Sequence, residues 1–358
     1  MTTPGFFEQY DDATLAKLRI FELYAQEWIP VFLARPQPDF LAVHIFDFFS
    51  GPGGDQKGVY GSPLRILDQL RLYHSKGLAG WGNVPIHVHL FDKDRKMISQ
   101  LHSTINQPGW RIPGVQADCR QLAFQDALAE HNDLLSNGRV AKLLIIDQYG
   151  VDEVSDDIFK KLIEFPTTDF IFFLSSSTFH RFRSHPAIKQ KIGPLEDSYD
   201  VHRVAVDYYR NLIPKEAGVF LAPFSIKKRS NVYGLVFCSH HPLGIHKFLK
   251  VAWDNDQIVG EANFDIDREN ISHGELLLGF EEMRPTKVRV FEAQLEQALR
   301  RGEMRTEANV VRFCIEAGMT CQHSAPILKK LKAEGVIGIS FRVPDVQRLS
   351  SPRPILMK

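Results

Sequence analysis

The residues best suited to bind a ligand form a glycine-rich turn directly after an apolar, aromatic run. Residues 43–49 read VHIFDFF, and the turn SGPGGDQKG follows at residues 50–58. Glycines allow positive φ and let the backbone approach a ligand closely. A helix that starts after such a turn also offers free N–H groups to an electronegative ligand. The pattern predicts a nucleotide-type site at the end of a strand, and the alternative is a plain turn.

Three kinds of nucleotide site begin with such a turn. A phosphate-binding loop requires Lys and then Ser or Thr after its second glycine, whereas Val59 and Tyr60 follow Gly58. A dinucleotide fingerprint requires a third glycine where Gln56 stands, and an acid about 20 residues further on. An S-adenosylmethionine (SAM) site requires an acid before the loop, two glycines in it, and an acid after the next strand for the ribose hydroxyls. The chain supplies this set in order, with Ser50 inside the same loop: Asp47, Gly51, Gly53 and Asp92.

Acids also end other apolar runs, which favours a ligand site over a plain turn. They occur in ADC at residues 117–119 and in IIDQYG at residues 145–150. Ligands in open α/β sheets bind at the carboxyl ends of the strands. We therefore predict SAM as the cofactor.

The elements that must position these residues alternate between strands and helices along most of the chain. Strands are predicted at 43–49, 86–92, 110–119, 142–150 and 169–177, and helices at 12–34, 62–76 (with Ser62 as N-cap), 94–104, 121–135, 155–164, 200–213 and 244–253. Two strands at 219–226 and 232–239 form a predicted hairpin. Such alternation indicates an α/β sheet with helices on both faces. Five parallel strands and a hairpin are the pattern of the Rossmann-like, seven-stranded SAM-methyltransferase sheet.

The C-terminal part of the chain changes to a helical pattern. Helices are predicted at 287–301, 306–317 and 325–334, with Thr306 and Ser324 as N-caps and with Gly318 and Gly335 as terminators. A strand at 336–343 follows, and the last residues, PILMK, could return beside it. Three helices and a hairpin are the layout of a winged helix-turn-helix. We expect a helical segment at 1–40, a SAM-methyltransferase-like domain at 41–255, a linker at 256–286 and a winged helix domain at 287–358.

The chain resembles the three-Cys-motif partner protein family over most of its length. The resemblance is carried by Lys17-x3-Phe21-x2-Tyr24-x3-Trp28, FDFFSGPGG (46–54), SPL (62–64), FDKD (91–94), IDQYG (146–150) and YGLVFCSHHPLG (233–244). It implies a SAM-methyltransferase-like domain and a winged-helix tail, encoded beside a radical-SAM-type three-Cys protein that could be a partner. It also implies which parts of SAM the site residues face: the methionine for Asp47, Gly51 and Gly53, the ribose for Asp92, and the adenine for Asp118 and Cys119.

The end of the fourth predicted strand is the candidate for catalysis. Many amino-group methyltransferases carry an acid or Asn, two prolines and an aromatic residue there, so that the acid orients the target amine and the ring stacks on the base. This chain has Asp147, Gln148, Tyr149 and Gly150 instead. Proline fixes φ and has no N–H, so Gln148 in its place leaves two interpretations open. The residues are either a catalytic set, or a turn in which Asp147 caps and Tyr149 packs.

Two basic segments are candidates for nucleic-acid binding. Arg181 and Arg183 alternate with phenylalanines after the fifth strand, which suits phosphates and bases, although a helix with solvated Arg is the alternative. In the tail, residues 286–358 carry 13 Lys and Arg against 7 Asp and Glu, which hints at a polyanionic partner or a plain solvated surface. The predicted recognition helix, which could also contact protein, carries Gln322, His323, Lys329 and Lys330.

The composition argues against several other classes of protein. The four cysteines form no C-x-x-C pair, so neither a disulfide framework nor a zinc ribbon is expected, and His240, His241 and His246 lack neighbouring carboxylates for a metal. No apolar run is long enough to cross a bilayer, and no secretory signal is expected. A cytoplasmic location fits.

We therefore expect a SAM-dependent methyltransferase that acts on nucleic acid, at a base amino group. The alternative is a non-catalytic protein of the same fold that binds nucleic acid or a radical-SAM-type three-Cys protein.

Overall fold

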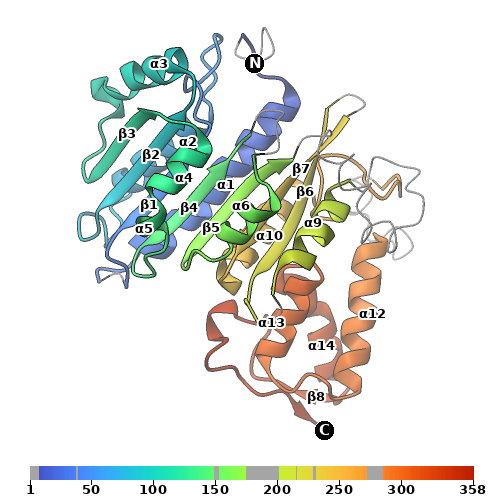
Figure 1. Cartoon of the computed structure of the whole chain (residues 1–358). Coiled ribbons are helices and arrows are strands. Elements are labelled where there is room, and N and C mark those ends of the chain that lie inside the picture. The colour runs from blue at the N-terminus through green and yellow to red at the C-terminus, as the bar shows by residue number, and fades with distance from the viewer. Residues whose placement is uncertain are drawn as a thin grey trace. The chain divides into compact units, whose positions relative to one another are not determined.

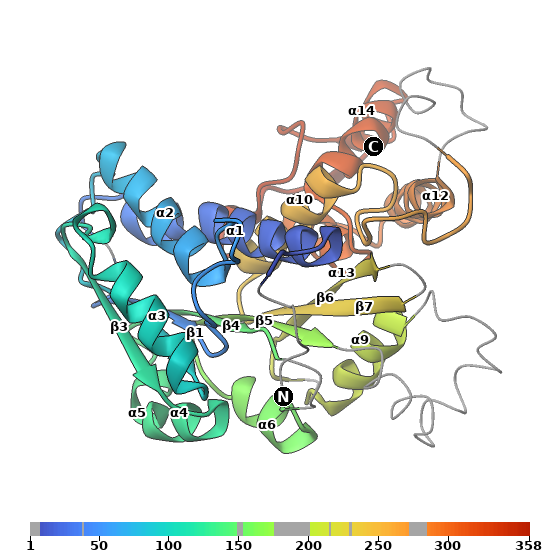
Figure 2. The same cartoon turned by 90° about the horizontal axis from the view of Figure 1, so that it is seen from above.

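Figures 1 and 2 show a computed structural model of the chain, which describes residues 8–37, 39–148, 153–174, 201–214, 216–228, 231–271 and 285–358. Contacts between residues divide the chain into a sheet unit, Met1–His241, and a C-terminal unit, Pro242–Lys358. The second unit thus includes the helix that was predicted at 244–253. The domain limits inferred from the sequence stay a prediction.

The sheet unit contains a seven-stranded, mostly parallel sheet. Its strands are β1 (Val43–Asp47), β2 (Ile86–Asp92), β3 (Val115–Gln121), β4 (Ala141–Ile146), β5 (Thr168–Leu174), β6 (Phe220–Lys228) and β7 (Asn231–Ser239). They lie in the order β3-β2-β1-β4-β5-β7-β6, and β7 runs antiparallel to both of its neighbours. The predicted α/β sheet with a closing hairpin is confirmed. Because Asp47 lies opposite Leu90 of β2 and Ile145 of β4, the carboxyl ends of the central strands meet at one edge.

Helices cover both faces of this sheet, and Figure 2 shows α1 and α2 on one side with α6 and α9 on the other. The helices of this unit are α1 (Asp12–Leu33), α2 (Ser62–Ser75), α3 (Arg95–Ile105), α4 (Phe124–Glu130), α5 (Asn132–Leu135), α6 (Asp156–Leu162) and α9 (Val201–Leu212). Every residue of β1 and β4 is buried, as expected of parallel strands that are covered on both faces. An aromatic core that includes Phe46, Phe172 and Tyr209 fills one of these faces.

Helix α1 is tied to the sheet by a buried polar cluster. The Tyr24 hydroxyl donates to Asp169 Oδ2 of β5 at 2.6 Å, and Ser239 Oγ of β7 donates to Asp169 Oδ1 at 2.5 Å. Burial raises the pKa of Asp169 to about 6. The ring of Tyr24 also contacts Phe237 edge-on, with 4.7 Å between the ring centroids. These contacts hold α1 against β5 and β7.

Three predicted elements of this unit differ from the structure. The third strand begins at Val115 rather than at residue 110, because Gly114 takes a left-handed turn with φ 81° just before it. The helix predicted at 121–135 breaks into α4 and α5 at His131, whose φ and ψ are −94° and 13°. The N-cap of α2 is Gly61, and the hydroxyl of Ser62 is used elsewhere.

The C-terminal unit is helical, with one very short hairpin. It contains α10 (Pro242–Asn255), α12 (Thr286–Arg300), α13 (Glu307–Glu316), α14 (Ala325–Ala333), β8 (Ile337–Gly338) and β9 (Leu356–Met357). Its core gathers Trp253, Phe291 and Leu328 among other apolar side chains. The Thr306 cap is confirmed with a reciprocal bond to Asn309, and Gly318 and Gly335 follow their helices with φ 65° and 74°.

The strand predicted at 336–343 is wrong beyond its first residues. Glu307, at the start of α13, is 0% exposed, and its carboxylate accepts the backbone N–H groups of Asp345 and Arg353. Arg353 Nε also donates to Glu307 Oε2 at 2.9 Å. These bonds to the buried Glu307 carboxylate hold the segment after β8 across the helix start instead of letting it continue as a strand.

The described part of the chain contains no helix that combines the length and the apolar character needed to span a membrane.

Candidate functional site

The glycine-rich loop after β1 is folded against the end of β2. Gly51 and Gly53 have φ values of 58° and 92°, a region that residues with a side chain rarely adopt. A Cβ atom on Gly53 would lie 2.8 Å from Leu101 Cδ1 of α3. The Ser50 N–H donates to the Phe91 carbonyl at 2.8 Å, and the Gly51 N–H donates to Asp92 Oδ2 at 3.0 Å. Positive φ therefore favours glycine at both positions, and at Gly53 the loop also fits closely against Leu101.

Asp47 holds this loop through hydrogen bonds of its side chain and its backbone. Its carboxylate accepts Ser62 Oγ at 2.6 Å and the Phe49 N–H at 3.1 Å, while Ser50 Oγ donates to the Asp47 carbonyl. The side chain is completely buried, and this burial raises the pKa of Asp47 to about 7 against the lowering effect of its hydrogen bonds. The nearby charges of Asp147 and Asp92 raise it further. Asp47 thus ties the loop to the first turn of α2. Nothing in the sequence pattern reveals that Ser62 is the partner of Asp47.

Asp92 ends β2 and remains able to bind a ligand. Its Oδ1 accepts the Asp94 N–H at 2.8 Å and its Oδ2 accepts the Gly51 N–H. Burial raises the pKa of Asp92. A carboxylate offers about four lone-pair sites, so each oxygen can accept one further hydrogen bond. An ionised carboxylate only accepts hydrogen bonds, so Asp92 is suited to bind the two hydroxyl groups of a ribose.

The two candidate residues on β3 differ in position. Cys119 lies in the row of Leu90 and Asp47, whereas Asp118 is exposed and lies opposite His89. Successive side chains of a strand point to opposite faces, so Cys119 shares the face of Asp47 and Asp118 does not. Burial and the charges of Asp118 and Asp47 raise the pKa of Cys119 to about 12, which keeps the thiol protonated.

Gln121 is a site neighbour that the sequence analysis missed. It ends β3 opposite Asp92, and its Nε2 donates to the Lys93 carbonyl at 3.3 Å. Its polar side chain is ordinary for a strand end, so only the strand register reveals it.

Asp147 follows β4 and is paired with a lysine from α1. Lys17 Nζ lies 2.6 Å from Asp147 Oδ1, and each side chain is only 7% exposed. The Lys17 ammonium also lies over the ring of Phe173 in β5, 4.6 Å from its centroid. Lys17 is the first residue of the sequence motif in α1. The pair joins residues 130 positions apart, which no local pattern could predict.

Gln148 is engaged by backbone at both ends of its amide. Its Nε2 donates to the Phe173 carbonyl at 2.7 Å, and its Oε1 accepts the N–H groups of Glu153 and Val154 at 2.7 and 3.2 Å. The side chain therefore holds the segment after β4 against β5. Tyr149 and Gly150 lie outside the described residues.

The candidate nucleic-acid residues are described only in part. Arg181 and Arg183 lie outside the described residues. In the C-terminal unit Lys329 and Gln322 are exposed, whereas Lys330 pairs with Glu296 at 2.9 Å. His323 is half-buried, its Nδ1 accepts the Thr320 N–H at 3.2 Å, and burial lowers its pKa.

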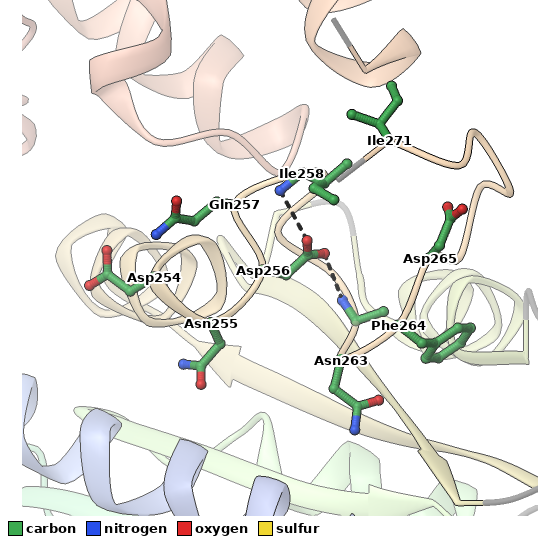
Figure 3. Close-up of a pocket in the computed structure, with 10 residues that line it drawn as sticks. Asp254, Asn255, Asp256, Gln257, Ile258, Asn263, Phe264, Asp265 and Ile271 are labelled. Carbon is green, nitrogen blue, oxygen red and sulfur yellow. Dashed lines mark hydrogen bonds between the residues drawn. The ribbon is translucent and has the colours of Figure 1, made fainter. Parts of the chain in front are cut away.

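A hollow lies in the C-terminal unit, with a volume of about 490 Å³ (Figure 3). Three aspartates line it, and one of them, Asp256, accepts backbone N–H groups through both oxygens: those of Ile258, Val259, Glu261 and Ala262. Its carboxylate is therefore occupied by its own turn. Among the described residues, no group of His, Cys, Asp and Glu side chains is arranged to hold a metal ion.

Comparisons with known proteins concern the fold. No protein-family model and no curated protein matches the sequence. Similar solved structures include Trm1 from Pyrococcus horikoshii with SAM (10% identity, TM-score 0.39, 64% of this chain and 56% of that chain). A further example is an rRNA methylase from Streptococcus thermophilus (7% identity, TM-score 0.31, 64% of this chain and 98% of that chain). Another is the O-methyltransferase TomG from Streptomyces achromogenes with SAM (10% identity, TM-score 0.33, 65% of this chain and 92% of that chain).

The chain thus spans little more than half of the Trm1 chain. Its own strand order and the single antiparallel strand β7 define a Rossmann-like α/β fold of the kind that methyltransferases use.

Proposed function

We propose that the protein is a SAM-dependent methyltransferase that acts on nucleic acid. The observation that carries the proposal is the hydrogen bond from the Gly51 N–H to Asp92 Oδ2, which docks a positive-φ glycine loop on the acid of the neighbouring strand. The loop lies where the strand order reverses between β1 and β4. In open α/β sheets this switch point is where ligands bind.

The residues around the loop fit SAM. Asp92 would accept the ribose hydroxyls, the backbone at Gly51 and Gly53 would receive the methionine part, and Cys119 would face the adenine side. SAM would supply a methyl group that its sulfonium already activates, so the chain has mainly to position the acceptor. Asp47 supports this site by bracing the loop rather than by offering an open carboxylate.

The proposed acceptor is an amino group of a base, held at the end of β4. Asp147 Oδ2 makes no hydrogen bond to any residue that the structure describes, so it can accept one from an amine. The aromatic ring of Tyr149 would stack on the base. The C-terminal unit, with α13 and α14 as the two helices of a winged helix-turn-helix, would dock the nucleic acid through exposed residues such as Lys329.

A second function is favoured by the environment of Gln148. Both polar atoms of its amide bond backbone groups, and Lys17 pairs with one oxygen of Asp147. Both features suit a non-catalytic protein of this fold that binds nucleic acid or a radical-SAM-type three-Cys protein.

The two functions are separated by a transfer assay. Tritium from methyl-labelled SAM is followed into unmodified RNA transcripts and unmodified DNA, with Asp147→Asn as the paired variant. Label in nucleic acid that depends on Asp147 supports the enzyme. SAM binding without transfer to any of these polymers favours the partner protein.

A further inference from the structure

The Lys17–Asp147 ion pair brings α1 into the candidate site. The two charged groups are 2.6 Å apart, and each side chain is 7% exposed. The desolvation cost of burying an ion pair can exceed the energy that its attraction returns, and apolar residues of similar volume often stabilise a fold equally well. The pair is therefore poorly explained by stability alone.

The position of the pair relative to the loop is set by the strand register. Asp47 lies opposite Ile145 of β4, so Asp147 lies two residues further along the neighbouring strand. The charge of Asp147 is close enough to raise the pKa of Asp47, as does that of Asp92 from the other side. The pKa of the Tyr10 hydroxyl is raised mainly by burial. The charges of Asp55, Asp147 and Asp47 raise it further, so Asp147 also lies near Tyr10. Asp147 and Asp92 therefore flank the loop, one on the β4 side and one on the β2 side.

The pair also has a definite orientation. Lys17 holds Oδ1 of Asp147, while Oδ2 has no hydrogen-bond partner in the part of the chain that the structure describes. The ring of Phe173 under the ammonium limits its movement. A ligand at the loop would meet a carboxylate whose charge Lys17 balances and whose Oδ2 is unpaired among the described residues.

We propose that Lys17 is a positioning residue that acts through Asp147, and that the pair balances charge beside the sulfonium of bound SAM. Lys17 then sets how strongly the site distinguishes SAM, which carries a positive charge on sulfur, from S-adenosylhomocysteine (SAH), which does not. This inference rests on the proposed function.

The sign of the effect follows from the two charges. Without the ammonium, a bare carboxylate would attract the sulfonium and favour SAM over SAH. Without the carboxylate, a bare ammonium would repel it and favour SAH. For charges several ångströms apart in a partly solvated site, each change amounts to roughly five- to tenfold in relative affinity.

The test is calorimetric titration of the full chain with SAM and with SAH. The quantity measured is the ratio of the two Kd values, SAM over SAH, in the wild type, Lys17→Met, Asp147→Asn and the double variant. We expect the ratio to fall in Lys17→Met, to rise in Asp147→Asn and to return near the wild-type value in the double variant. Lys17→Arg, which keeps the charge, should keep the ratio.

A matched control is Lys142→Met, which removes another buried lysine. Lys142 is 0% exposed and lies at the start of β4, where its Nζ donates to the Asn137 carbonyl. Its loss should leave the ratio unchanged. If Lys17→Met does not fold, Asp147→Asn and Lys17→Arg still test the proposal, because the first should raise the ratio and the second should leave it unchanged.

A purely structural role for the pair would weaken both ligands equally. Unchanged ratios in the folded Lys17 and Asp147 variants, with a wild type that binds both ligands, would overturn this inference and leave the cofactor assignment standing. A folded wild type that binds neither ligand would overturn the proposed function and this inference together.

Discussion

The buried carboxylate of Asp47 should make the stability of the protein depend on pH in an unusual direction. Burial raises the pKa of Asp47 from 3.8 to about 7 in the folded chain. The folded state then holds a proton that the unfolded state has lost, so stability is greatest below the unfolded pKa and falls as the pH rises toward 7. With these pKa values the contribution of Asp47 to the free energy of unfolding falls by about 2–3 kcal/mol between pH 5 and pH 8.

The assay is urea unfolding at pH 5, 6, 7 and 8 for the wild type and for Asp47→Asn. Asparagine keeps an acceptor for the Phe49 N–H and cannot ionise, so this contribution disappears. The raised pKa of Asp169 acts in the same direction in both proteins, and the difference between them isolates Asp47. Parallel pH profiles of the two proteins would refute the reasoning.

Two further predictions concern the loop and the C-terminal unit. Gly53→Ala should cost at least about 1–2 kcal/mol of stability and weaken SAM binding, because its Cβ would meet Leu101 at φ 92°. Gly58→Ala, at φ 83° with nothing within 4 Å, should cost only the backbone strain and leave SAM affinity unchanged. Equal loss of SAM affinity in both variants would show that the close fit of the loop at Gly53 does not determine SAM binding. Lys329→Glu should weaken binding to a nucleic-acid duplex and flatten its salt dependence more than Lys330→Glu does, because Lys330 already pairs with an acid. Fluorescence anisotropy at several salt concentrations measures the affinity and its salt dependence. Unchanged binding in the two variants would favour a protein as the partner of the C-terminal unit.

The sheet could be predicted because its signals are local. The run Leu143 to Ile146 is continuous and buried, and the two strands of the hairpin are separated by a basic turn, so periodicity and spacing were enough. The glycine loop was equally visible, since positive φ at Gly51 and Gly53 demands a residue type that can be read directly.

The contacts that complete the site could not be predicted because each joins distant parts of the chain. Lys17 reaches Asp147 across the fold, and Ser62 turns its hydroxyl to Asp47 instead of capping α2. The amide of Gln148 donates to the carbonyl of Phe173, 25 residues further on. The short β8 has the same origin, because Glu307 takes the hydrogen bonds of the segment that the pattern had assigned to a strand.

The central claim is that the loop and Asp92 bind SAM. Calorimetric titration of the purified chain with SAM and SAH, beside Asp92→Ala, tests it most directly. We expect micromolar binding of at least one ligand by the wild type, and its loss in a variant that keeps the folded circular dichroism spectrum. Absence of binding by the folded wild type, or unchanged affinity in Asp92→Ala, would contradict the assignment.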